Sequence, residues 1–150
     1  MLVNLLWPFL ILGVIGCLDE TVNTDEPDDF LFVAHKAVDG ERAVMEALFT
    51  GKVIVVDGCL RLDIDGGGAM VVWPPGYSYA EGVGGFNVRN ELGVNVGKIG
   101  QDFRFGGGFV QTLQQDGPVD EALRQEALTR CPGEYWIVGE MYSTEESPDN

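Results

Sequence analysis

Three cysteines and a single histidine are the first side chains of this sequence in which to look for covalent or acid–base chemistry. A Ser-His-Asp or Cys-His catalytic site would have to use His35. That residue follows an acidic segment, and the chain contains no Gly-x-Ser-x-Gly motif. The spacing of cysteines and histidine fits no zinc site. We therefore expect His35 to be an ordinary surface histidine and the protein not to be an enzyme.

Cys17 differs from the other cysteines because it closes an uncharged apolar run, residues 2–16. The run is shorter than the ~20 residues that a membrane-crossing helix needs. The sequence Val14-Ile15-Gly16-Cys17 resembles the cleavage site of bacterial lipoprotein signal peptides. We predict that residues 1–16 are a signal peptide and that Cys17 becomes a lipid-carrying N-terminus. Plain secretion and a buried N-terminal strand or helix are the alternatives.

An even pair, Cys59 and Cys131, remains once Cys17 is assigned to a lipid. Outside the cytoplasm such a pair usually forms a disulfide. By the chain-entropy argument, closing the loop between them would restrict the unfolded chain by about 4 kcal/mol. Two buried thiols are the alternative.

Acidic residues dominate the charge, which is −15 at pH 7. Nucleic acids bind through Lys and Arg side chains that neutralise phosphates, so we expect no nucleic-acid partner. Anionic lipid head groups would also be repelled, and the lipid on Cys17 must supply the membrane contact. Residues 17–29 are acidic, contain no base and predict a disordered tether. Calcium binding by this cluster is the alternative, but its spacing matches no metal loop.

Other acidic and glycine-rich motifs are better explained by turns than by ligand sites. Asp57, Asp63 and Asp65 faintly resemble a calcium loop, yet the twelfth position from Asp63 is Pro74 where a glutamate is needed. The two glycine triplets, 66–68 and 106–108, precede no Lys-Ser or Lys-Thr pair and predict bends in a curved sheet. We therefore expect no metal and no cofactor.

Short β-type runs separated by glycine make up the region between the tether and the polar tail. The strands are predicted at residues 52–56, 59–64, 69–73, 86–89, 94–96, 103–105, 109–113 and 135–142. Residues 90–93 are predicted to be the turn of a hairpin between the strands at 86–89 and 94–96. A helix is predicted at about residues 118–131, with acidic residues early and arginines late. Its apolar face would carry Val119, Ala122, Leu123 and Ala127. Residues 40–50 fit either a short helix or the start of a long first strand.

These elements predict one mainly β domain over residues 30–143, followed by a polar tail at 144–150. Many short strands with glycine bends and one helix favour a small curved barrel, and an OB-like barrel fits best. The helix would lie before the last strand, whereas the usual OB helix lies between the third and fourth strands.

Four motifs together are similar to those of an uncharacterised family of small bacterial extracytoplasmic domains. They are Gly58-Cys59-Leu60-Arg61-Leu62, Val72-Trp73-Pro74-Pro75-Gly76, Gly106-Gly107-Gly108 and Cys131-Pro132-Gly133-Glu134-Tyr135-Trp136. The resemblance covers about residues 45–142. It implies a secreted or lipid-anchored β domain with Cys59 paired to Cys131, and it implies no activity.

Aromatic side chains offer the best candidate ligand site. Trp73, Tyr77 and Tyr79, with Tyr135 and Trp136, could form a platform for a glycan or a peptide, although the tryptophans fit a core as well. Residues 77–85 combine tyrosines with glycines and predict a binding loop. We expect a lipid-anchored extracytoplasmic module that binds a protein, a peptide or a glycan. A structural or envelope-assembly lipoprotein without a small ligand, or a carboxylate-dependent hydrolase, are the alternatives.

Overall fold

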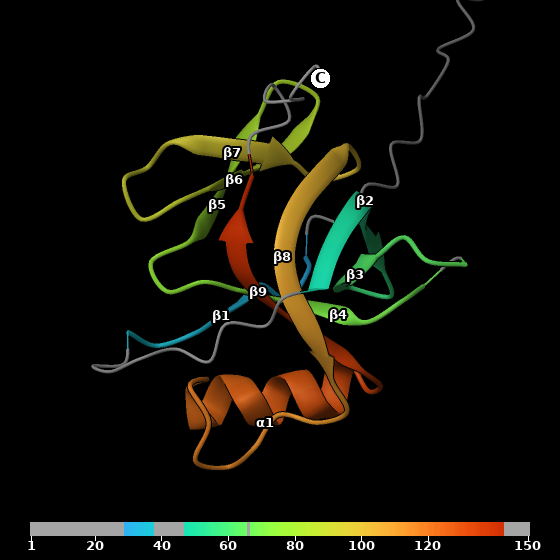
Figure 1. Cartoon of the computed structure of the whole chain (residues 1–150), viewed down its shortest axis with the longest axis vertical. Helices are drawn as coiled ribbons and strands as arrows, with labels where there is room; N and C mark the ends of the chain where they lie inside the picture. The colour runs from blue at the N-terminus through green and yellow to red at the C-terminus, as the bar shows by residue number, and fades with distance from the viewer. Residues whose placement is uncertain (1–28, 38–46, 66, 143–150) are drawn as a thin grey trace, which may run out of the picture.

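The computed structural model describes residues 29–37, 47–65 and 67–142. The predicted signal peptide, Cys17, the tail and all of the tether except Asp29 lie outside these ranges. The described residues form nine strands and one helix (Figure 1). In chain order these are β1 (Val33–Ala34), β2 (Ala47–Val56), β3 (Cys59–Leu62), β4 (Met70–Trp73), β5 (Ser78–Gly82), β6 (Gly85–Arg89), β7 (Asn95–Lys98), β8 (Asp102–Val110), α1 (Glu121–Arg130) and β9 (Tyr135–Met141).

Five of the strands close into a barrel in the order β4-β3-β2-β8-β9, and β9 pairs back onto β4. Neighbours are antiparallel except β4 and β9, which run parallel. Numbered along the chain, the barrel strands follow the order 1-2-3-5-4-1, which is the strand order of an OB fold. The predicted mainly β, OB-like barrel is therefore confirmed, as is a helix before the last strand.

The long strand β2 joins the two sides of the barrel. Its first part, from Ala47 to Lys52, pairs with β8, and its second part, from Val53 to Val56, pairs with β3. Residues 47–50 therefore belong to a long first strand, as one of the two sequence interpretations had it, while residues 40–46 lie outside the described part. The strand ends at Asp57-Gly58, where both residues have positive φ (50° and 72°), as a type I′ hairpin turn requires.

The second glycine triplet lies inside a strand, so the two short strands predicted at residues 103–105 and 109–113 are wrong, although the sheet curves at the glycines as predicted. β8 runs through residues 106–108 with a register shift against β9 between Phe105 and Gly107. A Cβ on Gly107 would collide with the Ile137 carbonyl and with the indole of Trp136. The missing side chain thus lets β9 lie directly against β8, and the strand curves without ending.

A three-stranded meander, β5-β6-β7, occupies the place of the usual OB helix, between the third and fourth barrel strands. Its β6–β7 hairpin was predicted, whereas β5 falls in the segment predicted as a loop. The meander packs on one end of the barrel core. Gly97 in β7 lies so close to the ring of Phe103 in β8 that no Cβ fits between them.

Helix α1 begins later than predicted, because Asp120 is its N-cap and accepts a hydrogen bond from the Ala122 N–H (3.0 Å). The predicted apolar face is only partly right. Ala127 is buried, but Ala122 is exposed and Arg124 is buried in its place. The guanidinium of Arg124 donates to the Leu113 carbonyl and to Glu121, which is why a charged residue can lie on the buried face.

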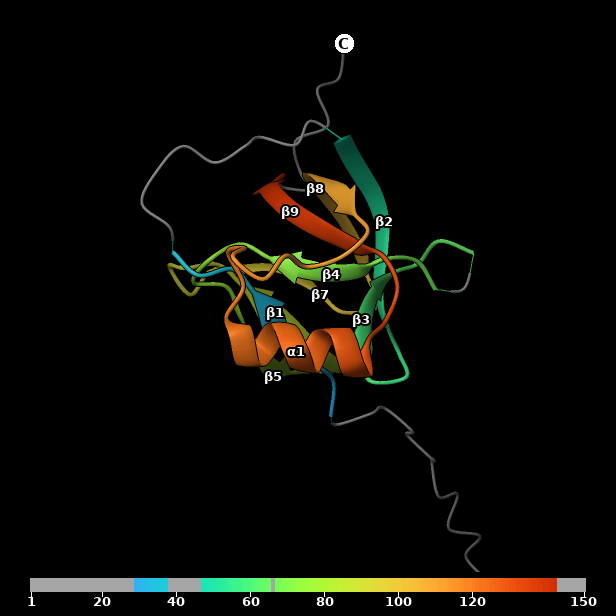
Figure 2. The same ribbon diagram turned by 90° about the horizontal axis from the view of Figure 1, so that it is seen from below.

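Two hydrophobic cores lie on opposite faces of β4, all four residues of which are buried. Val71 and Trp73 point into the barrel, together with Leu60, Phe103 and Phe105. Met70 and Val72 belong to the second core, which also includes residues of β1, α1 and the disulfide. Figure 2 shows α1 and β1 on one side of β4, with β8 and β9 on the other.

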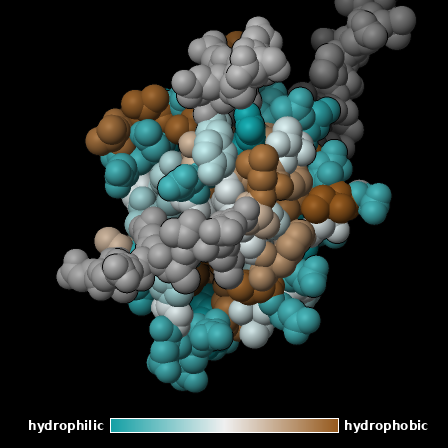
Figure 3. Space-filling model, viewed as in Figure 1, coloured by the Kyte–Doolittle hydropathy of each residue, from teal (hydrophilic) through white to brown (hydrophobic). Residues whose placement is uncertain are grey.

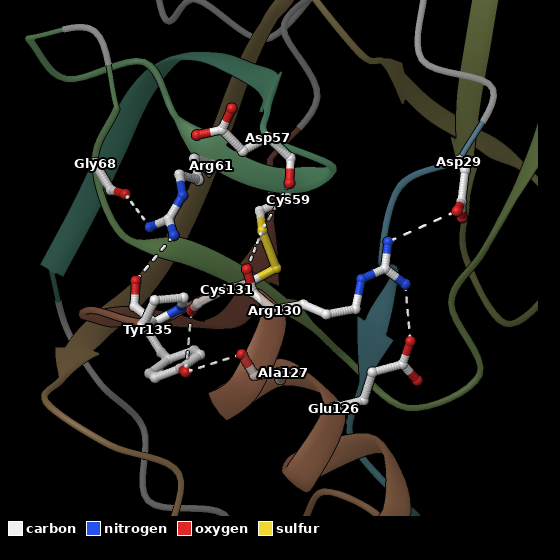
Figure 4. The surroundings of a disulfide bond; sticks show 11 residues. Asp29, Asp57, Cys59, Arg61, Gly68, Glu126, Ala127, Arg130, Cys131 and Tyr135 are labelled. Carbon is white, nitrogen blue, oxygen red and sulfur yellow. Dashed lines mark hydrogen bonds and ion pairs between the residues drawn. A yellow bond between two sulfur atoms is a disulfide. The ribbon is translucent and has the colours of Figure 1, made fainter.

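The disulfide between Cys59 and Cys131 is formed, with the two Cα atoms 5.7 Å apart (Figure 4). It joins the first residue of β3 to the C-cap of α1, so it pins the helix onto the outside of the barrel. Arg61 strengthens the same junction, because its guanidinium donates to the carbonyls of Gly68 (3.0 Å) and Pro132 (2.9 Å). Both sulfurs belong to nearly fully buried residues.

Candidate functional site

The outer face of the second and third barrel strands, where OB folds bind oligonucleotides and oligosaccharides, is covered in this protein. On β4 this face consists of Met70 and Val72, both fully buried under the second core. β1 contributes to the cover, since Val33 pairs with Val72 and Leu31 bridges to Cys59. The loop between the first two barrel strands is only the Asp57-Gly58 turn. In the described part of the chain, the β4 portion of the usual OB site is therefore covered.

An open groove lies instead between the meander and the end of β9. It is open to solvent and has a volume of about 610 Å³, within the ~300–1,000 Å³ range of ligand sites. Two kinds of polar side chain line it, four amides and two tyrosines: Asn87, Asn90, Asn95, Gln101, Tyr77 and Tyr142. Val94, Val96 and Met141 supply apolar wall, and Lys98 is the cation. We call this feature the amide-lined groove.

The amides of Asn90 and Asn95 are held in fixed orientations by their own backbone. The Asn90 Oδ1 accepts hydrogen bonds from the N–H groups of Leu92 (3.0 Å) and Val94 (2.9 Å), which builds the β6–β7 turn. The Asn95 Oδ1 accepts one from the Gly97 N–H (3.0 Å). With the oxygens engaged, the Nδ2 groups remain as donors that have no partner within the described residues. Two oriented amide donors thus line the groove.

The two remaining amides make no side-chain hydrogen bond within the described ranges. Gln101 is exposed beside β8, and its backbone N–H donates to the Lys98 carbonyl (3.0 Å). The Asn87 side chain lies against Gly82, where a Cβ would collide with its Nδ2. Each of these amides can both donate and accept, so they suit a ligand that carries hydroxyl or amide groups.

Two tyrosines, Tyr77 and Tyr142, line the groove. The ring of Tyr77 stacks on Trp73 with centroids 6.4 Å apart and planes 14° apart. Burial, and secondarily the charge of Glu91, raise the pKa of Tyr77, so its hydroxyl stays protonated at neutral pH. The Tyr142 hydroxyl donates to Glu140 (3.4 Å), and the Arg104 guanidinium lies 5.8 Å from its ring centroid. Both rings therefore have supported positions.

Glu91 and Glu140 lie beside the groove tyrosines Tyr77 and Tyr142, but neither glutamate lines the groove itself. No Asp or Glu is among the described residues that line it, and the one charged lining residue there is Lys98. The Lys98 ammonium donates to the Val83 carbonyl in the β5–β6 turn (2.9 Å). The described lining residues also include no serine, cysteine or histidine. This arrangement can hold a ligand by hydrogen bonds and ring contacts, and it presents no nucleophile beside a base.

Of the residues predicted as a ligand platform, Trp73 and Tyr77 stack on each other, but they do not form an exposed platform with Tyr79. Trp73 is fully buried in the barrel, where it supports the Tyr77 ring. Tyr77 lines the groove, whereas Tyr79 is 44% exposed and packs on Phe30 and Phe86 in an aromatic cluster outside it. Of the three, only Tyr77 is brought to the groove.

Other candidate residues lie in turns and in the wall of the second core. Asp57 and Asp65 adopt left-handed conformations with φ of 50°, consistent with the turn interpretation. His35 is half-buried and forms an isolated antiparallel β-bridge with Val119. Its backbone N–H donates to the Trp73 carbonyl (2.9 Å). It is therefore not the plain surface histidine that we expected. Within the described ranges no cluster of His, Cys, Asp or Glu is suited to hold a metal ion.

Exposed apolar side chains form two further surfaces. Leu92 and Val94 protrude at the β6–β7 turn, and Leu48 and Phe109 protrude from β2 and β8. Figure 3 shows apolar side chains at one end of the meander and over β2 and β8, with more hydrophilic surface between them.

Comparison of this chain with protein-family models, curated proteins and solved structures finds no match. Helix α1 is too short to cross a membrane, and the described residues contain no other helix.

Proposed function

We propose that this protein is a non-enzymatic binding module, held outside the cytoplasm by a lipid on Cys17, that takes its ligand in the amide-lined groove. The observation that carries the proposal is the groove itself: four amides and two tyrosines gather in a volume of ligand size. Within the described ranges the amide Nδ2 groups of Asn90 and Asn95 have no hydrogen-bond partner, and a ligand can satisfy them.

The compartment is argued from the cysteines. The disulfide uses Cys59 and Cys131, which leaves Cys17 as the one cysteine outside the bond. Disulfides persist in oxidising compartments and are rare in the cytosol. An unpaired cysteine directly after an apolar leader is accounted for if it carries the lipid. The resemblance to extracytoplasmic domains points the same way.

The anchor is tested by fractionation and intact-mass measurement of the protein made in a bacterium. We expect membrane association and a mature chain that begins at lipid-modified Cys17. The Cys17→Ser variant should leave the membrane or stay unprocessed. A mass that retains Met1 and carries no lipid on Cys17 would overturn the anchor.

The binding role is tested by NMR on the purified, ¹⁵N-labelled protein in detergent. Two probe mixtures are added in turn, one of neutral oligosaccharides and one of unstructured peptides. We expect one mixture to shift the side-chain NH₂ signals of Asn90, Asn95 and Gln101, while the signal of exposed Gln115 stays in place. If neither mixture moves the groove signals, the protein is not a binding module of this kind, and a structural role without a small ligand is favoured.

A further inference from the structure

We infer that the ligand of the amide-lined groove is a neutral saccharide chain, which rests on the proposed function and names the chemistry of its ligand. Sugars present hydroxyl groups that donate and accept, together with C–H faces that pack on aromatic rings. The groove offers amides of both kinds: donors at Asn90 and Asn95, and amides free to donate or accept at Asn87 and Gln101.

Charge argues for a neutral chain. The whole protein carries −15, so a polyanionic glycan would meet a repulsive field before it reached the groove. Among the described lining residues Lys98 alone carries a charge, and its ammonium is already bonded to the Val83 carbonyl. One cation is too little to hold a row of carboxylates or phosphates, but it tolerates an uncharged sugar.

A peptide is less well suited, because the edge of β7 is already partly engaged. A peptide that adds as a strand needs unpaired backbone groups along a sheet edge. The Gly97 N–H in β7 is taken by the Asn95 side chain, and β7 has only four residues. The face of Gly97 is filled by the Phe103 ring. The described groove wall includes only three apolar side chains, Val94, Val96 and Met141, to anchor a peptide.

Two tyrosine rings that line the groove are supported by neighbouring side chains. Tyr77 is braced by Trp73, and its hydroxyl, like that of any tyrosine, is protonated at physiological pH and can donate. Tyr142 is braced by Arg104. A ring whose position is fixed before binding loses little conformational freedom when a sugar packs on it.

The test is calorimetric titration of the full-length protein in detergent with chitotetraose, cellotetraose and tetragalacturonate. We expect one or both neutral probes to bind and the anionic probe not to bind. Gln101→Ala and Tyr77→Phe should each weaken binding about fivefold, the loss of roughly one hydrogen bond. Gln115→Ala is the matched control, an exposed glutamine outside the groove, and should bind like the parent protein.

Four results would overturn the inference. Tighter binding of tetragalacturonate than of the neutral probes would refute neutrality. Equal saccharide binding by all variants would place the site elsewhere. If no saccharide binds but the peptide mixture shifts the groove signals in the NMR experiment, the saccharide is wrong and the binding module stands. If neither class of probe binds, the proposed function fails with it.

Discussion

Loss of the Cys59–Cys131 disulfide should destabilise the domain more than any single surface change. The bond closes a loop with a sequence separation of 72 residues. The chain-entropy argument gives about 4 kcal/mol for a loop of that length. Because a domain of this size unfolds with an entropy near 0.2 kcal/mol/K, the Tm should fall by roughly 20 °C.

The perturbation is the double variant Cys59→Ala/Cys131→Ala, measured by thermal circular dichroism beside the parent protein. Alanine is preferred because both positions are buried and an added hydroxyl would need a partner. A reducing agent serves as the internal control. It should lower the Tm of the parent protein but leave that of the double variant unchanged. If reduction opens the bond by mass and the Tm does not move, the disulfide does not hold α1 on the barrel and our reasoning is refuted.

Three further predictions concern acid stability, the meander and nucleic acid. The Arg124 hydrogen bond lowers the pKa of Glu121 from 4.5 to about 2, so the stability it contributes is complete above pH 4.5 and is lost as the pH falls towards 2. The Tm difference between Glu121→Gln and the parent protein should shrink over that range; a constant difference would contradict the linkage. Gly97→Ala forces a Cβ onto Phe103 and should cost about 1–3 kcal/mol in urea unfolding, whereas Gly139→Ala meets only ordinary contacts and should cost less. No shift of single-stranded DNA or RNA should occur at ~0.15 M salt, and a salt-dependent shift with micromolar protein would contradict the charge argument.

Local sequence patterns predicted most of the barrel, because those strands carry strong β signals. The β-branched run before Asp57-Gly58 and the alternation of Leu60 and Leu62 each predict a strand that the structure contains. The disulfide followed from cysteine parity and is confirmed.

Tertiary packing explains what the sequence could not predict. β5 contains glycine and glutamate, and it forms because β6 pairs with it along its whole length. β1 has two residues and depends on β4 for its pairing. From the sequence, Arg124 was predicted to be a charge near the C-terminal end of the helix. The position of the Leu113 carbonyl, which accepts from its guanidinium, shows why it can be buried. The glycines of β8 look like a break between two strands. The local sequence does not show that β9 lies close against them, which is why glycine is needed there.

The groove was largely missed for a related reason. Sequence reasoning looked for aromatic residues and found Tyr77, but the asparagines of β6 and β7 look like turn and strand polar residues. The segment Asn90-Glu91-Leu92-Gly93 predicts a turn, which is correct, and the turn is what orients the Asn90 amide. The sequence therefore contained a signal for the groove, because asparagines lie at and beside a predicted turn. Only the folded barrel brings them close to Gln101 and Tyr142.

The central claim is that this protein binds its ligand in the amide-lined groove while anchored outside the cytoplasm. In-cell photo-crosslinking tests it most directly. Gln101 or, as the matched control, Gln115 is replaced by p-benzoylphenylalanine, and membranes of irradiated cells are examined for crosslinked species of the protein. The account predicts a distinct crosslinked product in the membrane fraction from position 101 and none from position 115. Absence of a product at position 101, or the same product from both positions, would contradict it.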